Sequence, residues 1–286
     1  MSEHDEEHGG RSWVARLGDD FAPRLASALA MAAVAALFTF SGPTPFALLV
    51  VVVALLVSWE WGRLVHGPDA GLQVAVLIGT AAVSGLLATF VSVGLGLLAL
   101  PIGAILATLL SLGRNSFFSA AGVFYAGFPA VAAIWLRYDP TLGLQAAIFL
   151  ILIVATADTA AFLCGRLVGG PLLSPGISPN KTWAGFIGAL IASAIVGGLF
   201  WLAVPGGSVV RLATTGALLG LVAQAGDLAE SALKRRFGAK DAGSILPGHG
   251  GVMDRVDGLL AALSAAGLAA AAINMYSPAR ALLLGS

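Results

Sequence analysis

The chain alternates long apolar segments with short connections that are polar or contain proline. A helix that crosses the hydrocarbon core of a membrane needs about 20 mainly apolar residues. Nine segments meet this requirement, at approximately residues 23–41, 44–65, 71–90, 92–112, 117–136, 142–165, 183–204, 209–233 and 256–274. The pattern therefore predicts an all-α polytopic integral membrane protein with about nine transmembrane helices.

Two details refine this prediction. The boundary between the third and fourth segments depends only on Val91 and Ser92. Pro101 and Pro129 lie inside predicted helices, where proline removes a backbone hydrogen bond and bends the helix. We expect a short turn at Val91 and Ser92, and a kink at each of the two prolines.

Composition agrees with the membrane assignment. The 286 residues are 58% hydrophobic and 10% charged, whereas soluble domains carry about 25% charged residues. The formal net charge is zero, which argues against nucleic acid as a partner. Residues 1–22 form an acidic tail that lacks the basic start of a signal peptide. We divide the remainder into N-terminal transmembrane helices (23–140) and a C-terminal transmembrane catalytic region (141–286).

The distribution of basic residues predicts the orientation of the chain. With nine spans and a cytoplasmic N-terminus, only Arg137, Arg211 and Arg280 face away from the cytoplasm, out of 15 lysines and arginines. Short cytoplasmic connections favour lysine and arginine. The sequence thus predicts a multi-pass protein of the plasma membrane or inner membrane, with its charged C-terminal segment on the cytoplasmic face.

That charged segment, residues 231–257, interrupts an otherwise apolar sequence. Just before it, Asp227 and Glu230 share a helical face with Lys234, and Asp254 and Asp257 repeat the i, i+3 spacing at the next helix. Carboxylates at two helix ends predict a Mg²⁺ site, and the neighbouring cations would bind phosphates. The alternative is an interfacial cluster of salt bridges. The glycines at 250 and 251 favour a ligand in close contact with the backbone.

Other polar residues lie in or beside the predicted helices. Asp158 lies toward the same face as the charged segment, where it either joins the polar site or pairs with Arg166. The loop before the seventh span carries Ser178 and Lys181 and is expected to be ordered. Glu60 stands between two tryptophans, so we interpret it as part of an interfacial aromatic belt and assign it no role.

These motifs resemble the signature of the phosphatidate cytidylyltransferases, also called CDP-diacylglycerol synthases. That signature reads S-x-x-K-R-x-x-x-x-K-D followed by H-G-G-x-x-D-R-x-D. The matching positions are Ser231, Lys234, Arg235, Lys240, Asp241, His249, Gly250, Gly251, Asp254, Arg255 and Asp257. The resemblance covers roughly residues 150–260. It departs from the family at Ala184, where a glutamate is usual, and at Phe162, where tyrosine is common.

The resemblance implies that CTP reacts with phosphatidic acid at the membrane, giving CDP-diacylglycerol and pyrophosphate. It implies Mg²⁺ held by Asp227 and Asp254 as the first candidate ligands, with Asp257 and Asp158 as second candidates. It makes Asp227, Asp254, Lys234 and Lys240 the candidate catalytic residues. Substrate contacts are expected from Ser178, Lys181, Ser231, Arg235, Asp241, His249 and Arg255. A second cation such as K⁺ and a homodimer are left open.

Three other functions share part of this pattern. A CDP-alcohol phosphatidyltransferase would continue the Asp254–Asp257 motif with Ala-Arg, but Ala261 is followed by Ala262. A CTP-dependent polyprenol kinase would transfer the γ-phosphoryl group and release CDP. A transporter would place its charges near the middle of the membrane in discontinuous helices, whereas here they gather at one face.

Overall fold

The computed structural model describes residues 21–69, 71–111, 115–243, 245 and 250–286, with side chains from Leu29 onward. The N-terminal half contains α1 (Phe21–Phe40), α2 (Pro43–His66), α3 (Gly71–Phe90), α4 (Val93–Leu110) and α5 (Ser116–Arg137). The C-terminal half contains α6 (Gly143–Leu167), β1 (Leu172–Ser174), β2 (Ser178–Thr182), α7 (Trp183–Leu199), the 3₁₀ turn η2 (Phe200–Ala203), α8 (Val209–Arg236), α9 (Met253–Ile273) and α10 (Pro278–Leu284).

The helices confirm the predicted class of an all-α polytopic membrane protein. Within the described part of the chain, eight helices, α2 to α9, are long and apolar enough to cross a membrane. For the first predicted span, the helix is present as α1, but its described apolar part, Leu29–Phe40, is shorter than a full span. Ser92 separates α3 from α4 by accepting a hydrogen bond from the Leu95 amide. Pro101 and Pro129 lie inside α4 and α5, as expected.

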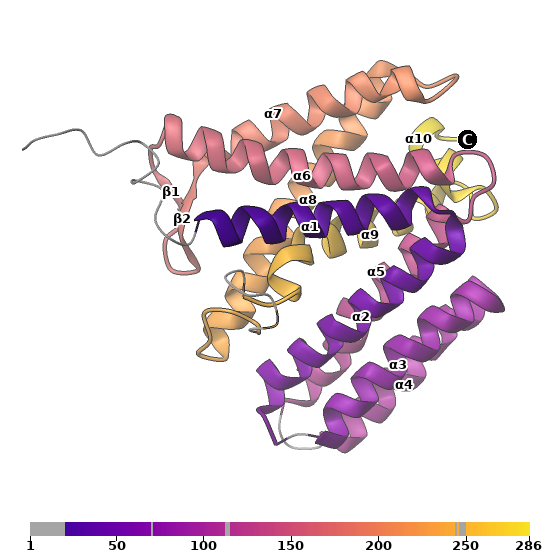
Figure 1. The fold of residues 1–286 in the computed structure, drawn as a ribbon, viewed down its shortest axis with the longest axis vertical. Helices are drawn as coiled ribbons and strands as arrows, with labels where there is room; N and C mark the ends of the chain where they lie inside the picture. The colour runs from indigo at the N-terminus through magenta and orange to yellow at the C-terminus, as the bar shows by residue number, and fades with distance from the viewer. Residues whose placement is uncertain (1–20, 70, 112–114, 244, 246–249) are drawn as a thin grey trace, which may run out of the picture.

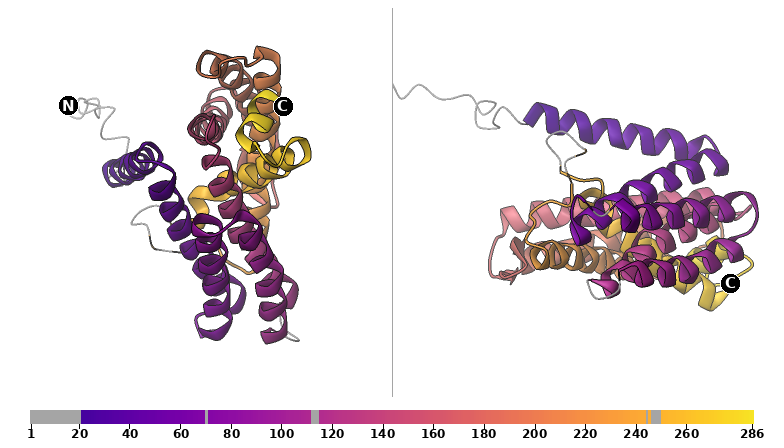
Figure 2. Two further views of the ribbon diagram at one scale, coloured as in Figure 1. Left: turned by 90° about the vertical axis from the view of Figure 1, so that its right-hand side faces the viewer. Right: turned by 90° about the horizontal axis from the view of Figure 1, so that it is seen from below.

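The helices form two groups that α9 joins (Figure 1). Helices α2 to α5 pack together in one group, and α6, α7 and α8 pack together in the other. Helix α9 contacts both α5 and α8. Helix α1 runs along the outside of the bundle, where it touches α2 and α6 (Figure 2). The close approach of α7 and α8 depends on glycine, because a Cβ on Gly197 would lie 3.1 Å from the Cα of Gly216.

Two elements were not predicted from the pattern. The loop before α7 is a short antiparallel hairpin, in which Leu172 pairs with Thr182 and Ser174 with Ser178. The Thr182 side chain then accepts a hydrogen bond from the Gly185 amide and so starts α7. The second element, α10, is too short to be detected as a span, and it packs against α5, α6, α8 and α9.

The end of the bundle near α10 is organised by a buried carboxylate. One oxygen of Asp139 accepts hydrogen bonds from the amides of Thr141 and Leu142 and from the Thr141 hydroxyl. The other oxygen accepts from the Ala279 amide, so Asp139 links the start of α6 to α10. Burial by itself would raise the pKa of Asp139, but these hydrogen bonds to the charged form outweigh it and hold the pKa below its usual value.

Replacing Asp139 by alanine is expected to destabilise the fold by about 2 kcal/mol at pH 7, since capping bonds and a buried acceptor are lost. Because the folded-state pKa is depressed, this stability is complete above the unfolded-state pKa of about 3.9 and disappears as pH falls through the folded value. Thermal unfolding in detergent, measured from neutral to acidic pH, tests both statements. Asp69→Ala, at an exposed position, is the control. If the difference in unfolding temperature between wild type and Asp139→Ala did not change with pH, the charge of Asp139 would not be the source of the stability.

Candidate active site

The last turns of α8 carry the first carboxylates of the site. Asp227, Glu230 and Lys234 lie on one helical face, as their spacing predicted, and the Lys234 ammonium lies 2.8 Å from a Glu230 oxygen. Glu230 is only 2% exposed. Its Oε1 atom is buried and has no hydrogen-bond partner among the described residues. A buried carboxylate oxygen without a partner is costly, so this atom is a candidate ligand for a bound cation.

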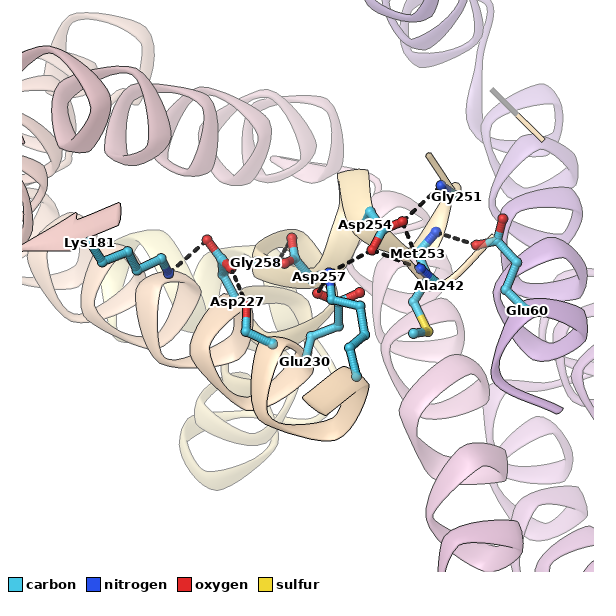
Figure 3. A network of polar contacts seen from close by, with 12 residues as sticks. Glu60, Lys181, Asp227, Glu230, Ala242, Gly251, Met253, Asp254, Asp257 and Gly258 are labelled. Carbon is cyan, nitrogen blue, oxygen red and sulfur yellow. Dashed lines mark hydrogen bonds and ion pairs between the residues drawn. The ribbon is translucent and has the colours of Figure 1, made fainter. Parts of the chain in front are cut away.

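Helix α9 begins three residues earlier than the hydropathy pattern predicted, at Met253 rather than at residue 256. Asp254 and Asp257 are therefore in its first two turns, beside the end of α8 (Figure 3). The hydropathy pattern placed the start too late because the charged residues at 254 and 255 lower the local hydropathy. The helix itself can begin before them, since the free amides of its first turn find acceptors.

Asp254 connects the two helix ends to the intervening loop. Its Oδ1 atom lies 2.6 Å from the Lys234 ammonium, and its Oδ2 atom accepts hydrogen bonds from the amides of Ala242 and Gly251 at 3.0 and 2.8 Å. These contacts occupy both oxygens of the carboxylate. In this arrangement Asp254 orders the loop and orients Lys234, while its predicted role as a metal ligand stays a prediction.

A separate group of carboxylates has the spacing of a cation site. One oxygen each of Asp227, Glu230 and Asp257 lies within 4.8 Å of the other two. Three converging carboxylates suit a hard divalent cation such as Mg²⁺. The family resemblance named Asp227 and Asp257, together with Asp254 and Asp158, as ligands, whereas Glu230 entered the prediction only as one of the carboxylates at the helix ends. The signal for Glu230 was present, because it lies one helical turn beyond Asp227.

The interpretation of Glu60 as part of an interfacial belt is wrong. Glu60 has no exposed surface. Its two oxygens accept hydrogen bonds from the amides of Val252 and Met253, at 2.9 and 2.6 Å, and so cap the start of α9 (Figure 3). A carboxylate at a helix N-terminus is favoured by the free amides and by the helix dipole. An acidic residue inside an apolar helix was the signal that could have identified it.

The glycines near Glu60 also differ from expectation. A Cβ on Gly243 would lie 2.5 Å from a Glu60 oxygen, and one on Gly251 would lie 2.7 Å from it. Both positions therefore require glycine for the close approach of the backbone to Glu60. The signature glycine at 251 packs against a carboxylate of the protein itself, and the ligand that its sequence context suggested stays a prediction.

The hairpin supplies the opposite wall of the site. The Lys181 ammonium lies 2.7 Å from Asp227 Oδ2, which places the loop before α7 beside the end of α8. Asp158 of α6 accepts a hydrogen bond from the Gln224 side chain at 3.1 Å, so its partner is this amide rather than Arg166. The Ser231 hydroxyl donates to Asp227 at 3.4 Å. Ion pairs and a carboxylate cluster thus coexist, so the salt bridges expected from the spacing are present, and the Mg²⁺ site stays a prediction.

These side chains enclose a cavity of about 610 Å³, within the usual range for small-molecule sites. Five carboxylates and three cations are among its lining residues, so its wall has a negative formal charge. The charged residues on this wall are Asp158, Asp227, Glu230, Asp254, Asp257, Lys181, Lys234 and Arg255; Ser178, Asn180, Thr182 and Gln224 add neutral polar groups. An acidic wall repels nucleotides and lipid phosphates unless cations offset its charge.

Ser231 and three further predicted residues lie outside this lining. Arg235, Lys240 and Asp241 are exposed, at the end of α8 and in the loop that follows. His249 lies outside the described residues. Of the two departures from the family pattern, Phe162 lines the cavity, and Ala184 is in the first turn of α7 beside the lining residue Gly185. The structure therefore brings most of the predicted site residues together around one cavity, from α6, β2, α8 and α9, and leaves three exposed polar residues apart from it.

The fold and the site together define a polytopic membrane protein with an acidic cavity at one end of its helices, an arrangement typical of enzymes that act on phosphate groups with the help of cations. A sequence profile of the cytidylyltransferase family matches residues 22–272. The chain belongs to the cytidylyltransferase family.

Two relatives illustrate this membership. The phosphatidate cytidylyltransferase of Brucella suis biovar 1 is 41% identical over 249 residues, which cover 84% of this chain and 89% of that protein. The phosphatidate cytidylyltransferase of Staphylococcus saprophyticus is 41% identical over 158 residues, which cover 54% of this chain and 60% of that protein. The longer match extends well beyond the signature and includes most of the transmembrane helices.

Proposed function

We propose that this protein transfers the cytidylyl group of CTP to phosphatidate, giving CDP-diacylglycerol and pyrophosphate. The observation that carries the proposal is the cavity in which Asp227, Glu230 and Asp257 converge beside Lys181 and Arg255, at one end of an apolar bundle. Such a cavity admits a polar nucleotide and a lipid headgroup together. The names of the relatives supply the substrates that fit it.

In the proposed reaction, a phosphate oxygen of phosphatidate attacks the α-phosphorus of CTP in line. The bond between the α-phosphorus and its bridging oxygen to the β-phosphate breaks, and pyrophosphate leaves with the electron pair. Both reactants are anions, so their repulsion is the main obstacle. The chain's cations lower it: Lys181 and Arg255 on the cavity wall bind phosphate oxygens, and Lys234 holds Asp254 and Glu230 in place.

The carboxylate cluster fits Mg²⁺ because it offers three hard oxygen ligands and the Glu230 Oε1 atom, which has no partner among the described residues. Asp227, Glu230 and Asp257 would hold the ion, which when bound offsets negative charge on the phosphates. Relative to the ligands that the resemblance implied, this set includes Glu230 and leaves out Asp254 and Asp158. Asp158 accepts a hydrogen bond from Gln224 and lines the same cavity.

The cavity is proposed to open on the cytoplasmic side, where CTP is available. Lys181, Lys234 and Arg255 come from three different elements and line the same cavity, and the excess of lysine and arginine on this side supports a cytoplasmic location. The corresponding membrane is the plasma membrane, or the inner membrane of a cell with two.

Labelled CTP tests the proposal directly. Purified protein in detergent, with phosphatidate and Mg²⁺, is expected to move the label of α-³²P-CTP into lipid and that of γ-³²P-CTP into pyrophosphate, in equal amounts. Chelation of Mg²⁺ should stop both the transfer into lipid and the release of pyrophosphate, and adding Mg²⁺ again should restore them. Appearance of the γ label in lipid would instead indicate a CTP-dependent kinase, and the absence of either transfer would contradict the proposal.

A further inference from the structure

A second cavity, with an almost wholly apolar wall, lies beside the candidate active site. It has a volume of about 670 Å³ and is lined by residues of α1, α2, α5, α6 and α9. Among the described residues, its lining contains only two polar side chains, Thr39 and Arg255. The Thr39 hydroxyl already donates to the Ala35 carbonyl at 2.7 Å. Arg255 is therefore the one charged residue in the described lining, and the body of an occupant must be apolar.

Arg255 lies on the walls of both cavities. This residue is therefore shared by the acidic cavity, with its carboxylate cluster, and the apolar cavity. A wall that is apolar along its length and cationic where it meets a phosphate-binding site is complementary to an anionic amphiphile, with its charge at Arg255 and its chain in the apolar space.

The apolar cavity also has the depth of a lipid chain. Along α2 its lining runs from Leu56 to Phe46, which at 1.5 Å per residue is about 15 Å. Half of a bilayer's hydrocarbon core is also about 15 Å thick. The length of the cavity along α2 therefore matches the thickness of one leaflet's hydrocarbon, the depth that an acyl chain occupies when its headgroup is at the surface.

We propose that this apolar cavity binds an acyl chain of phosphatidate while Arg255 holds the phosphate at the entrance to the active site. The inference rests on the proposed function and adds the place where the lipid lies. Lipid tails are as apolar as the wall, so burial by itself gives little preference. Selection in this cavity acts through shape and chain length, and long chains gain packing contacts that short chains do not make.

Two neighbouring alanines of α1 offer a matched test. Ala32 and Ala33 are both exposed, but only Ala32 is part of the described lining of the cavity. Phenylalanine at position 32 would occupy space needed by the chain, and phenylalanine at position 33 would not. Because both side chains are exposed, neither change overpacks the core.

The measurement is kcat/KM for dioleoyl-phosphatidate and for dihexanoyl-phosphatidate at saturating CTP. Ala32→Phe should lower kcat/KM for the dioleoyl substrate about tenfold, because the ring takes space that the bound acyl chain needs. For the dihexanoyl substrate, kcat/KM should stay within about twofold of the wild-type value. Ala33→Phe should change neither value. Equal losses on both substrates with Ala32→Phe, or no loss on either, would overturn the acyl-chain site.

Native mass spectrometry without CTP separates this proposal from the proposed function. Wild type and Ala33→Phe should retain added dioleoyl-phosphatidate, and Ala32→Phe should lose it. If wild type and Ala33→Phe retain the lipid, Ala32→Phe does not, and wild type transfers no label from CTP, the acyl-chain site is supported and the proposed reaction is contradicted. If the reaction proceeds and the two variants retain the lipid equally, the cavity proposal fails by itself.

Discussion

Replacing Asp257 by asparagine is expected to lower kcat about a hundredfold or more, because a lost carboxylate ligand removes several kcal/mol of charge stabilisation from the reaction. Asp257 contributes one of the three oxygens that converge within 4.8 Å. The neutral amide keeps the size of the side chain. Initial rates of CDP-diacylglycerol formation at saturating CTP and phosphatidate measure the effect, with Asp69→Asn as an exposed control away from the lining of both cavities.

Stability separates a role in cation binding from a role in folding. Without divalent cations, Asp257→Asn should unfold at the same temperature as wild type or above it, because one of three mutually repelling charges is gone. Addition of Mg²⁺ should raise the unfolding temperature of wild type, since a ligand that binds only the folded state stabilises it. The variant should show little of this increase. Full activity, or an unchanged Mg²⁺ response, would exclude Asp257 as a ligand.

Replacing Glu60 by glutamine is expected to lower kcat at least about tenfold, although Glu60 does not line the cavity. Glutamine offers one acceptor where the amides of Val252 and Met253 need two, and an unpaired buried amide costs about 1–3 kcal/mol. The first turn of α9 would then shift, and with it Asp254 and Asp257. Because the enzyme needs these side chains in place, a small displacement has a large effect on rate.

A positioning role for Glu60 makes a prediction that a purely structural role does not. The Mg²⁺ concentration for half-maximal activity should rise in Glu60→Gln, because Asp257 is carried on the displaced turn. Ser58→Ala is the matched control: Ser58 is also a buried polar residue of α2, and its hydroxyl has no partner among the described residues. A Glu60→Gln protein that unfolds at lower temperature but keeps the wild-type kcat and Mg²⁺ dependence would show that Glu60 serves stability alone.

Most of the transmembrane helices can be predicted from local sequence, but the start of the helix that carries Asp254 and Asp257 cannot. The positions of α2 to α8 follow from apolar segments of about 20 residues, because each spanning helix satisfies its own backbone hydrogen bonds and must be apolar along its length. The start of α9 does not follow in this way. It depends on Glu60, which lies 192 residues before Val252 in the chain and is brought to it only by packing.

The same contrast applies within the site. The spacing of Asp227, Glu230 and Lys234 is enough to place them on one face of α8, since i, i+3 and i+4 positions are neighbours on a helix. Their partners could not be deduced from spacing. Lys181 pairs with Asp227 from a hairpin, and Asp254 turns toward Lys234 and the loop amides, which leaves Glu230 in the carboxylate cluster.

The sequence by itself determined the class of membrane protein, the segments that form its helices and, through the signature at 231–257, the family resemblance. These features are local, because they depend on residue type and on spacing within one segment. The tertiary structure decided which carboxylates converge, which of them cap a helix or hold a loop, and how Arg255 comes to lie between a polar and an apolar cavity. Those outcomes depend on contacts between residues far apart in the chain, and only packing of the whole bundle fixes them.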